Sequence, residues 1–157
     1  MMTPRSSSSQ NPPGDSGIAT ALERIAEAFR AQTQETATRY GLSPLQVQIL
    51  SRMLKEKPGA CSVSSLAQGL GLTRPTVSDA VKTLEEKGFL TKAPDKLSAR
   101  QINLTLTRGG RTRAKQVAQY AKNITKAIAH LGAGQKDALF KALSQIIRQL
   151  QTDSVIH

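Results

Sequence analysis

Apolar residues recur at intervals of three and four along six segments of this 157-residue chain, and this spacing predicts helices that each bury one face. We expect these helices over residues 16–40, 44–57, 64–70, 74–87, 107–131 and 135–150. Residues 1–15 are instead rich in Ser and Pro and poor in apolar groups. Such a segment cannot bury enough surface to order itself, so we predict a disordered tail there.

Two of these helices, the first and the last, carry narrow apolar seams. Ile18, Leu22 and Ile25 form one seam, and the other includes Leu143 and Ile147. A narrow seam is typical of a helix that packs on a partner helix, and the alternative is that each helix covers its own domain. We therefore expect residues 16–40 and 107–157 to supply dimerisation helices around a central segment, residues 42–106.

The central segment contains two short helices in succession. The sequence places the start of the first at Ser64, which can accept a hydrogen bond from the first turn. Gly71 suits a left-handed helix end, and Leu72 is expected to point back into the core. Thr73 can cap the second helix with Pro75 in its first turn, where proline loses no hydrogen bond. This arrangement predicts a helix-turn-helix.

A β-hairpin is expected directly after the second short helix. Residues 89–92 can form one strand, and residues 100–106 alternate, with Ile102, Leu104 and Leu106 on one face. The turn between them, residues 94–98, is polar and contains one cation, Lys96. A second cation, Arg100, follows the turn. The predicted fold is mainly α with a small β-hairpin wing, which is a winged helix-turn-helix with flanking dimerisation helices.

The second short helix presents a polar face opposite its buried stripe. A recognition helix meets base edges through such a face near its N-terminus, and a basic wing tip can reach the neighbouring minor groove. An ordinary solvated helix face is the alternative. The candidate DNA-binding residues are Arg74, Pro75, Thr76, Ser78, Asp79, Lys82, Lys96 and Arg100.

Motifs in this segment resemble those of the multiple antibiotic resistance regulator (MarR) family of winged-helix transcription factors. The residues that carry the resemblance are Ser64-x-Leu66-Ala67, Leu72-Thr73-x-x-Thr76-Val77-Ser78, Leu84-Glu85-x-Lys87-Gly88-Phe89-Leu90 and Leu106-Thr107-x-x-Gly110. The wing of this family has the pattern Asp-x-x-Asp-x-Arg. Asp95 and Arg100 match its first aspartate and its arginine, whereas Ser98 stands in place of its second aspartate.

This resemblance covers most of the chain after about residue 18 and implies several properties. It implies a homodimer on a pseudo-palindromic double-stranded DNA operator, with Arg100 entering the minor groove. It also implies a small-molecule effector, often an anionic aromatic compound, that releases the DNA. The matching effector region borders Tyr40, Met53 and Tyr120.

The predicted helix after the wing begins with a dense run of cations. Arg108, Arg111, Arg113 and Lys115 all lie in its first turns. Cations at a helix N-terminus oppose the helix dipole, so local stability does not explain them. A nearby phosphate backbone would explain them, and a solvated surface run is the alternative.

Composition narrows the function classes. The formal net charge of +11 favours an anionic partner, with nucleic acid first, and aromatics at 3% disfavour an RNA reader built on stacking. The chain has no apolar run that could span a membrane and no apolar signal core, so we expect a cytoplasmic protein. No catalytic or metal-binding constellation is present, and we expect neither an enzyme nor a cofactor. Cys61 is expected to be a small buried hydrophobe, with a redox-sensing thiol as the alternative.

The sequence therefore predicts a homodimeric, sequence-specific DNA-binding regulator, a repressor released by an effector. The alternatives are a DNA-binding regulator that needs no ligand and a winged-helix module that binds protein.

Overall fold

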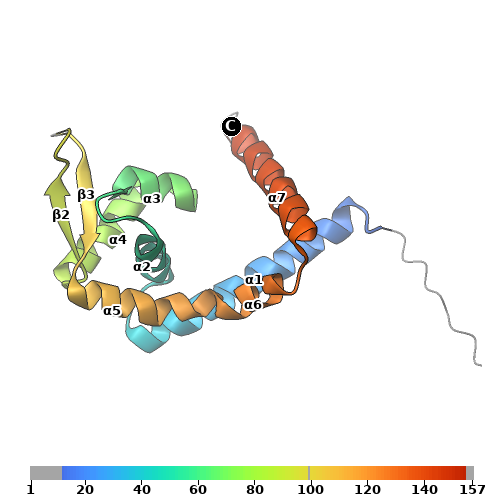
Figure 1. Ribbon diagram of the computed structural model, residues 1–157, viewed down its shortest axis with the longest axis horizontal. Coiled ribbons are helices and arrows are strands. Elements are labelled where there is room, and N and C mark those ends of the chain that lie inside the picture. The colour runs from blue at the N-terminus through green and yellow to red at the C-terminus, as the bar shows by residue number, and fades with distance from the viewer. Residues whose placement is uncertain (1–11, 99, 155–157) are drawn as a thin grey trace, which may run out of the picture.

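The computed structural model describes residues 12–98 and 100–154, so residues 1–11 of the predicted tail lie outside the described residues. The helices and strands, in chain order, are α1 (Asp15–Tyr40), α2 (Pro44–Lys55), β1 (Cys61–Ser62), α3 (Val63–Leu70), α4 (Arg74–Glu86), β2 (Leu90–Pro94), β3 (Ile102–Leu106), α5 (Arg108–Val117), the 3₁₀ turn η1 (Ala118–Ala121), α6 (Lys122–Ala129) and α7 (Ala133–Ser154). The mainly helical winged fold predicted from the sequence is confirmed (Figure 1).

The central winged helix-turn-helix segment is called the reader below. It consists of α2, α3, α4 and a three-stranded antiparallel sheet of order β1-β3-β2. Strand β3 is central, and its Leu104 lies opposite Cys61 of β1, while Leu106 lies opposite Leu90 of β2. The apolar stripes of the helices and the inner face of the sheet close over one core. Its largest fully buried side chains are Ile49, Leu50, Leu66, Leu84, Leu90, Leu104, Val47, Val77, Val81 and Val117.

Side-chain caps fix where the reader helices begin. Ser43 and Gln46 form a reciprocal capping box at α2, and Ser62 and Ser65 form another at α3. The prediction that the first short helix starts at Ser64 is wrong, because the capping residue is Ser62, two residues earlier, and the helix begins at Val63. Ser62 ends β1 and caps α3 at once, which leaves Ser64 exposed in the first turn of the helix.

Two expectations about side-chain and helix placement are also wrong. Leu72 is 40% exposed, because Gly71 turns the chain at φ 66° and puts Leu72 at the outer corner between α3 and α4. Gly134 lies inside α7 and does not precede it. Ile102 lies on the same face of β3 as Leu104 and Leu106, as expected, yet it is 51% exposed, because it pairs with Pro94 at the outer end of the strand.

The single helix predicted over residues 107–131 is divided by η1 into α5 and α6. A 3₁₀ turn has 3.0 residues per turn, so it rotates the side chains that follow relative to a continuous α-helix. Tyr120 lies in this turn and contacts Phe29 of α1 edge to face, with ring centroids 6.5 Å apart. The 3₁₀ turn is therefore the main part of this segment that packs on α1.

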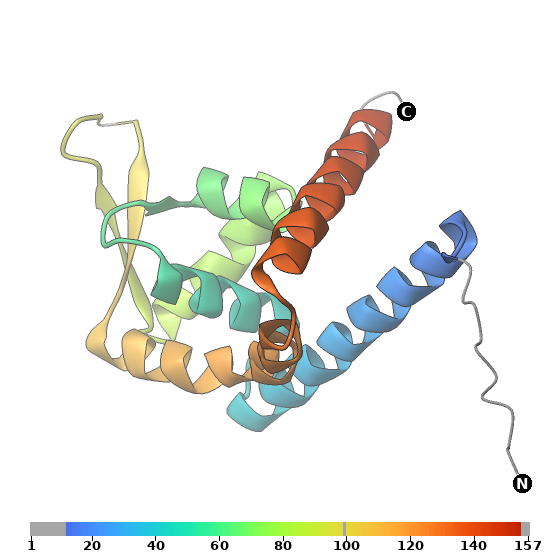
Figure 2. The ribbon, with the colours of Figure 1, turned by 45° about the vertical axis from the view of Figure 1, so that its right-hand side comes forward.

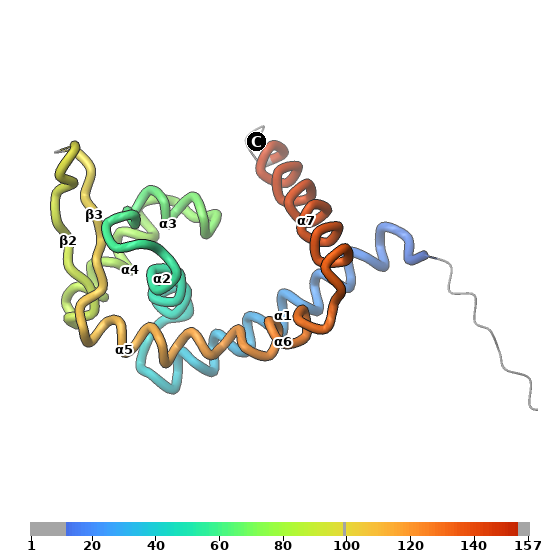
Figure 3. Tube along the Cα trace, in the orientation of Figure 1, coloured from blue at the N-terminus to red at the C-terminus, as the bar shows by residue number. Residues whose placement is uncertain are grey.

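The flanking helices extend away from the reader. Helix α1 packs on α2 and η1, whereas α7 rises from the end of α6 and extends away from the other elements (Figures 1 and 3). Large apolar side chains are exposed on these helices, including Ile25 at 52%, Phe140 at 73% and Ile147 at 54%. The structure therefore leaves the predicted seams open to solvent.

Candidate nucleic-acid interface

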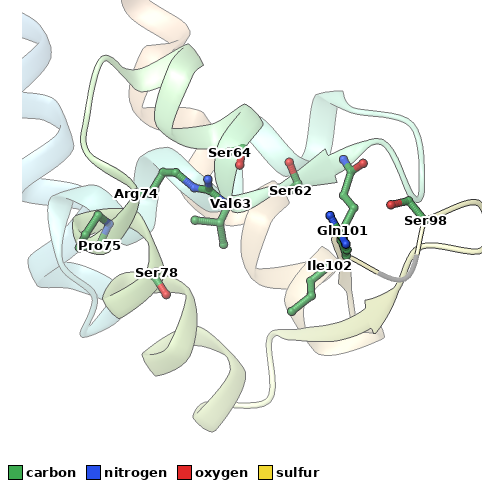
Figure 4. A pocket seen from close by; sticks show the side chains of 10 residues that line it. Ser62, Val63, Ser64, Arg74, Pro75, Ser78, Ser98, Gln101 and Ile102 are labelled. Atoms are coloured by element: carbon green, nitrogen blue, oxygen red, sulfur yellow. The ribbon is translucent and has the colours of Figure 1, made fainter.

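A hollow of about 640 Å³ lies between the beginnings of α3 and α4 and the wing (Figure 4). The side chains that line it are Ser62, Val63, Ser64, Arg74, Pro75, Ser78, Ser98, Arg100, Gln101 and Ile102. Four of these, Arg74, Pro75, Ser78 and Arg100, are candidate DNA-binding residues of the sequence analysis. The fold thus brings α4 and the wing arginine to one concave surface.

The cap and the buried stripe of α4 together aim its polar face outward. The Thr73 hydroxyl accepts from the backbone N–H of Thr76 at 3.4 Å and lies 2.8 Å from the Thr76 hydroxyl. Val77 and Val81 are fully buried on the opposite side. With that side fixed in the core, Arg74 in the first turn stays exposed and free to reach a ligand.

Four further candidate DNA-binding residues are exposed but do not line the hollow: Thr76, Asp79, Lys82 and Lys96. Asp79 and Lys82 lie farther along α4, and Lys96 lies at the wing tip. Their positions extend the surface beyond the hollow in both directions, as a ligand longer than the hollow would require.

Hydrogen bonds shape the wing tip. The Asp95 side chain accepts from the N–H of Leu97 at 3.3 Å, and the Asp95 N–H donates to the carbonyl of Gln101 at 2.8 Å. The N–H of Gln101 donates to the carbonyl of Ser98 at 3.1 Å. Across the part of the chain that the structure describes, no carboxylate pairs with Arg100. The hydrogen bonds of Asp95 and Gln101 order the turn of the wing on both sides of Arg100.

Sequence reasoning missed the contribution of α3 and of the inner wing to this surface. Ser62, Ser64 and Gln101 line the hollow, and none of them was a candidate. The capping box of Ser62 and Ser65 was the available signal, since it places the cap of α3 two residues earlier than predicted, beside the wing. The N–H groups of a first helical turn favour anions.

The cations at the beginning of α5 fall into two groups. The Arg113 guanidinium lies over the rings of Tyr40 and Phe89, at 5.0 and 5.5 Å from their centroids, and so joins α5 to α1 and to the wing base. Arg108, Arg111 and Lys115 are exposed. The phosphate explanation is therefore unnecessary for Arg113 and stays open for the other three.

Two of the three candidate effector residues share a cleft. Tyr40 and Tyr120 line a polar cleft of about 270 Å³ together with Gln32, Glu35, Thr36, Arg39, Gln116, Gln119 and Asn123. Burial raises the pKa of the Tyr120 hydroxyl above its ordinary value. The Oε1 atom of Gln32 is buried and has no hydrogen-bond partner in the described chain. Met53 lies in the reader core and does not line this cleft.

Cys61 is a buried residue of β1 with 3% exposure, as expected of a structural cysteine. Burial raises the pKa of its thiol, and this effect outweighs the hydrogen bond with Ser65, which lowers it. The thiolate is the reactive form of cysteine, so this environment disfavours oxidation.

Two features are absent from the described ranges, 12–98 and 100–154. None of the helices there is both long and apolar enough to cross a bilayer. No group of three or more His, Cys, Asp or Glu side chains there is placed to hold a metal ion.

Comparison with known proteins gives the same picture. Residues 40–101 match the model of the MarR family. The uncharacterized HTH-type transcriptional regulator YwaE of Bacillus subtilis is 28% identical over 137 residues, which cover 86% of this chain and 79% of that protein. The crystal structure of an S. aureus MepR–DNA complex is similar with a TM-score of 0.66 at 16% identity, covering 83% of this chain and 96% of that one. A MarR transcriptional regulator from Methanosarcina mazei gives 0.65 at 18% identity, covering 86% and 96%.

Proposed function

We infer that the chain is a member of the MarR family of transcriptional regulators, and we propose that it acts as a homodimeric repressor of a pseudo-palindromic operator, released by a small-molecule effector. The observation that carries the proposal is the hollow that Arg74 and Ser78 of α4 line together with Arg100 of the wing. We also propose that the protein is cytoplasmic, because its target is genomic DNA.

Each part of this surface has a role on duplex DNA that its chemistry supports. Arg74, at the N-terminal end of α4, spans to a guanine edge in the major groove, while the short Ser78 and Thr76 side chains allow close approach. Arg100 enters the adjacent minor groove, where narrow A·T-rich steps attract arginine. Lys82 and Lys96 bind phosphates on either side and set the register.

The remaining candidates contribute shape and selectivity. Pro75 supplies an exposed apolar contact beside Arg74, in reach of a thymine methyl group. Asp79 can accept from a cytosine amino group, and its carboxylate disfavours a register that would put it against a phosphate. Ser64, at the N-terminus of α3, lies where a backbone phosphate would meet unpaired amides.

A second copy of the chain is the proposed cover for the exposed apolar side chains of α1 and α7. Ile25, Phe140 and Ile147 are each more than half exposed in the single chain. Burying a fully exposed side chain of this size contributes roughly 1.5–3 kcal/mol, so each of these partly exposed side chains would contribute roughly half of that or more, which favours association of these helices over leaving them in water. A two-fold axis through them would set two readers about 10 base pairs apart.

Release by an effector is proposed to act through the cleft beside α1. The cleft lies between α1 and the segment from α5 to η1, and it contains Tyr40 and Tyr120. The Lys87 ammonium at the end of α4 donates to the carbonyl of Gly41, at the end of α1, at 2.8 Å. This bond links the helix that borders the cleft to the recognition helix, so a shift of α1 would move α4.

The proposal is tested by selecting bound duplexes from a random pool and titrating variants against the selected operator. Arg74→Ala should cost roughly 1–3 kcal/mol and relax the preference at one position of each half-site. Arg100→Ala should mainly relax the preference in flanking A·T-rich steps. Lys136→Ala, which removes an exposed cation on α7, is the matched control and should bind like the wild type. Selection of no common sequence, or equal affinity of all three variants, would overturn the DNA assignment.

The effector is tested on the same operator. Small aromatic carboxylates should release DNA from the wild type, and Tyr120→Leu should reduce that release while leaving affinity for the operator intact. If no compound in a broad metabolite set changes affinity, the protein is the regulator without a ligand that the sequence also allowed.

A further inference from the structure

The outer face of α5 carries three cations that the reading surface does not use. Arg108, Arg111 and Lys115 are spaced by three and four residues, so they form one row along the helix, here named the outer basic stripe. All three side chains are exposed, and in the described chain no carboxylate pairs with any of them. Lys122, also exposed, follows at the beginning of α6.

The outer basic stripe opposes the stability of its own helix. Like charges three or four residues apart repel on a helix surface, and cations in the first turn oppose the helix dipole. The first turn of α5 contains no acidic residue that would offset them. The arrangement therefore needs an explanation outside the folding of α5.

The outer basic stripe faces away from the proposed operator surface. Gly110, Ala114 and Val117 are the buried residues of α5, and they pack this helix on α2. In both Figure 1 and Figure 2, α2 lies between α5 and α3, while the hollow is lined by α3, α4 and the wing. One duplex held at the hollow consequently leaves the outer basic stripe in solvent.

The chemistry of this face selects among anionic partners. From Arg108 to Ala127 the chain exposes no large apolar side chain, so the face lacks the apolar surface that membrane-bound helices and protein interfaces use. It also exposes no aromatic ring on which single-stranded bases could stack. A row of cations with polar neighbours fits a regular phosphate backbone, which is the contact that binds DNA without reading its sequence.

We propose that the outer basic stripe binds the phosphates of a second DNA duplex, so that a molecule bound to its operator can bridge to another DNA segment. The proposal rests on the proposed function for the first duplex. Neutralising three phosphates gives a salt slope of roughly 2.7, which weakens the second contact roughly fortyfold between 50 and 200 mM salt.

A two-duplex capture assay tests the proposal. The selected operator is fixed to beads and saturated with labelled protein, and a fluorescent duplex of unrelated sequence is then added at 50 mM salt. The wild type should retain the second duplex, and the triple variant Arg108→Gln, Arg111→Gln, Lys115→Gln should retain at least tenfold less at equal occupancy of the beads. The control variant Arg24→Gln, Lys57→Gln, Lys136→Gln loses the same charge at other exposed sites and should behave like the wild type.

Each outcome decides the question. Failure of the wild type to retain the second duplex, or equal loss in both triple variants, would overturn the proposal. Tighter capture of double-stranded RNA or of anionic lipid vesicles would overturn the choice of DNA. If no operator can be selected, the proposed function fails by itself, and direct titration of unrelated duplex with both triple variants still tests the stripe. The melting temperature of the Arg108, Arg111, Lys115 variant should equal or exceed that of the wild type, because a repulsion is removed; a lower value would assign these cations to folding.

Discussion

Two neighbouring glycines at the start of α5 should respond in opposite ways to alanine. A Cβ atom on Gly110 would overlap the carbonyl oxygen of Phe89, which is backbone and has little room to move. On Gly109 the nearest atom would be the Thr107 Oγ1 at 3.9 Å, an ordinary contact. Both glycines lie in the first turn of the same helix, so one substitution is a close control for the other.

The size of the effect follows from the hydrogen bonds at and beside the Phe89 carbonyl. It accepts from the N–H of Thr107 at 3.1 Å, and the Thr107 hydroxyl donates to the carbonyl of Gly88 at 2.6 Å and accepts from Gly110 at 2.9 Å. Overpacking costs about 1–3 kcal/mol and a lost hydrogen bond about 0.5–1.5 kcal/mol. Gly110→Ala should therefore destabilise the protein by about 2–4 kcal/mol, whereas Gly109→Ala should stabilise it by about 0.5 kcal/mol through helix propensity.

Urea denaturation followed by circular dichroism, at one fixed protomer concentration, measures both effects. Gly110→Ala should also weaken operator binding, because this junction anchors the base of the wing to α5. If the urea midpoint of Gly110→Ala equals that of the wild type, the close approach of α5 to the wing base is refuted. Equal destabilisation by both variants would show that the loss comes from glycine removal in general.

Three further predictions concern assembly, the thiol and the link between helices. Phe140→Asp with Ile147→Asp should convert a dimer at micromolar concentration into a monomer by sedimentation, and an unchanged mass would contradict the proposed interface. Cys61→Ser should leave DNA binding nearly unchanged, and peroxide should release no DNA from the wild type; release that this variant abolishes would make Cys61 a sensor. Lys87→Met removes the exposed bond to Gly41 and should lower stability by about 0.5 kcal/mol while reducing effector-driven release, which titrations with and without effector would measure.

Local features of the sequence were sufficient for most of the helices and strands and for four of the residues that line the hollow between α4 and the wing. The cap at Thr73 and the buried spacing of Val77 and Val81 fix which face of α4 is polar, because helical periodicity is a property of a few consecutive residues. Cys61 was also expected to be buried, because a free cysteine is usually a small buried hydrophobe, and its exposure is 3%.

Only the tertiary structure decided which segments, distant in the sequence, surround a given residue. Leu72 reads as a core residue but lies at a corner, and Arg113 reads as one more surface cation but lies over two aromatic rings. Gly110 reads as a turn residue, yet its lack of a side chain is required by a backbone carbonyl about twenty residues earlier in the chain. These contacts join segments that are distant in sequence, and helical periodicity carries no information about which distant segment will lie opposite a given face.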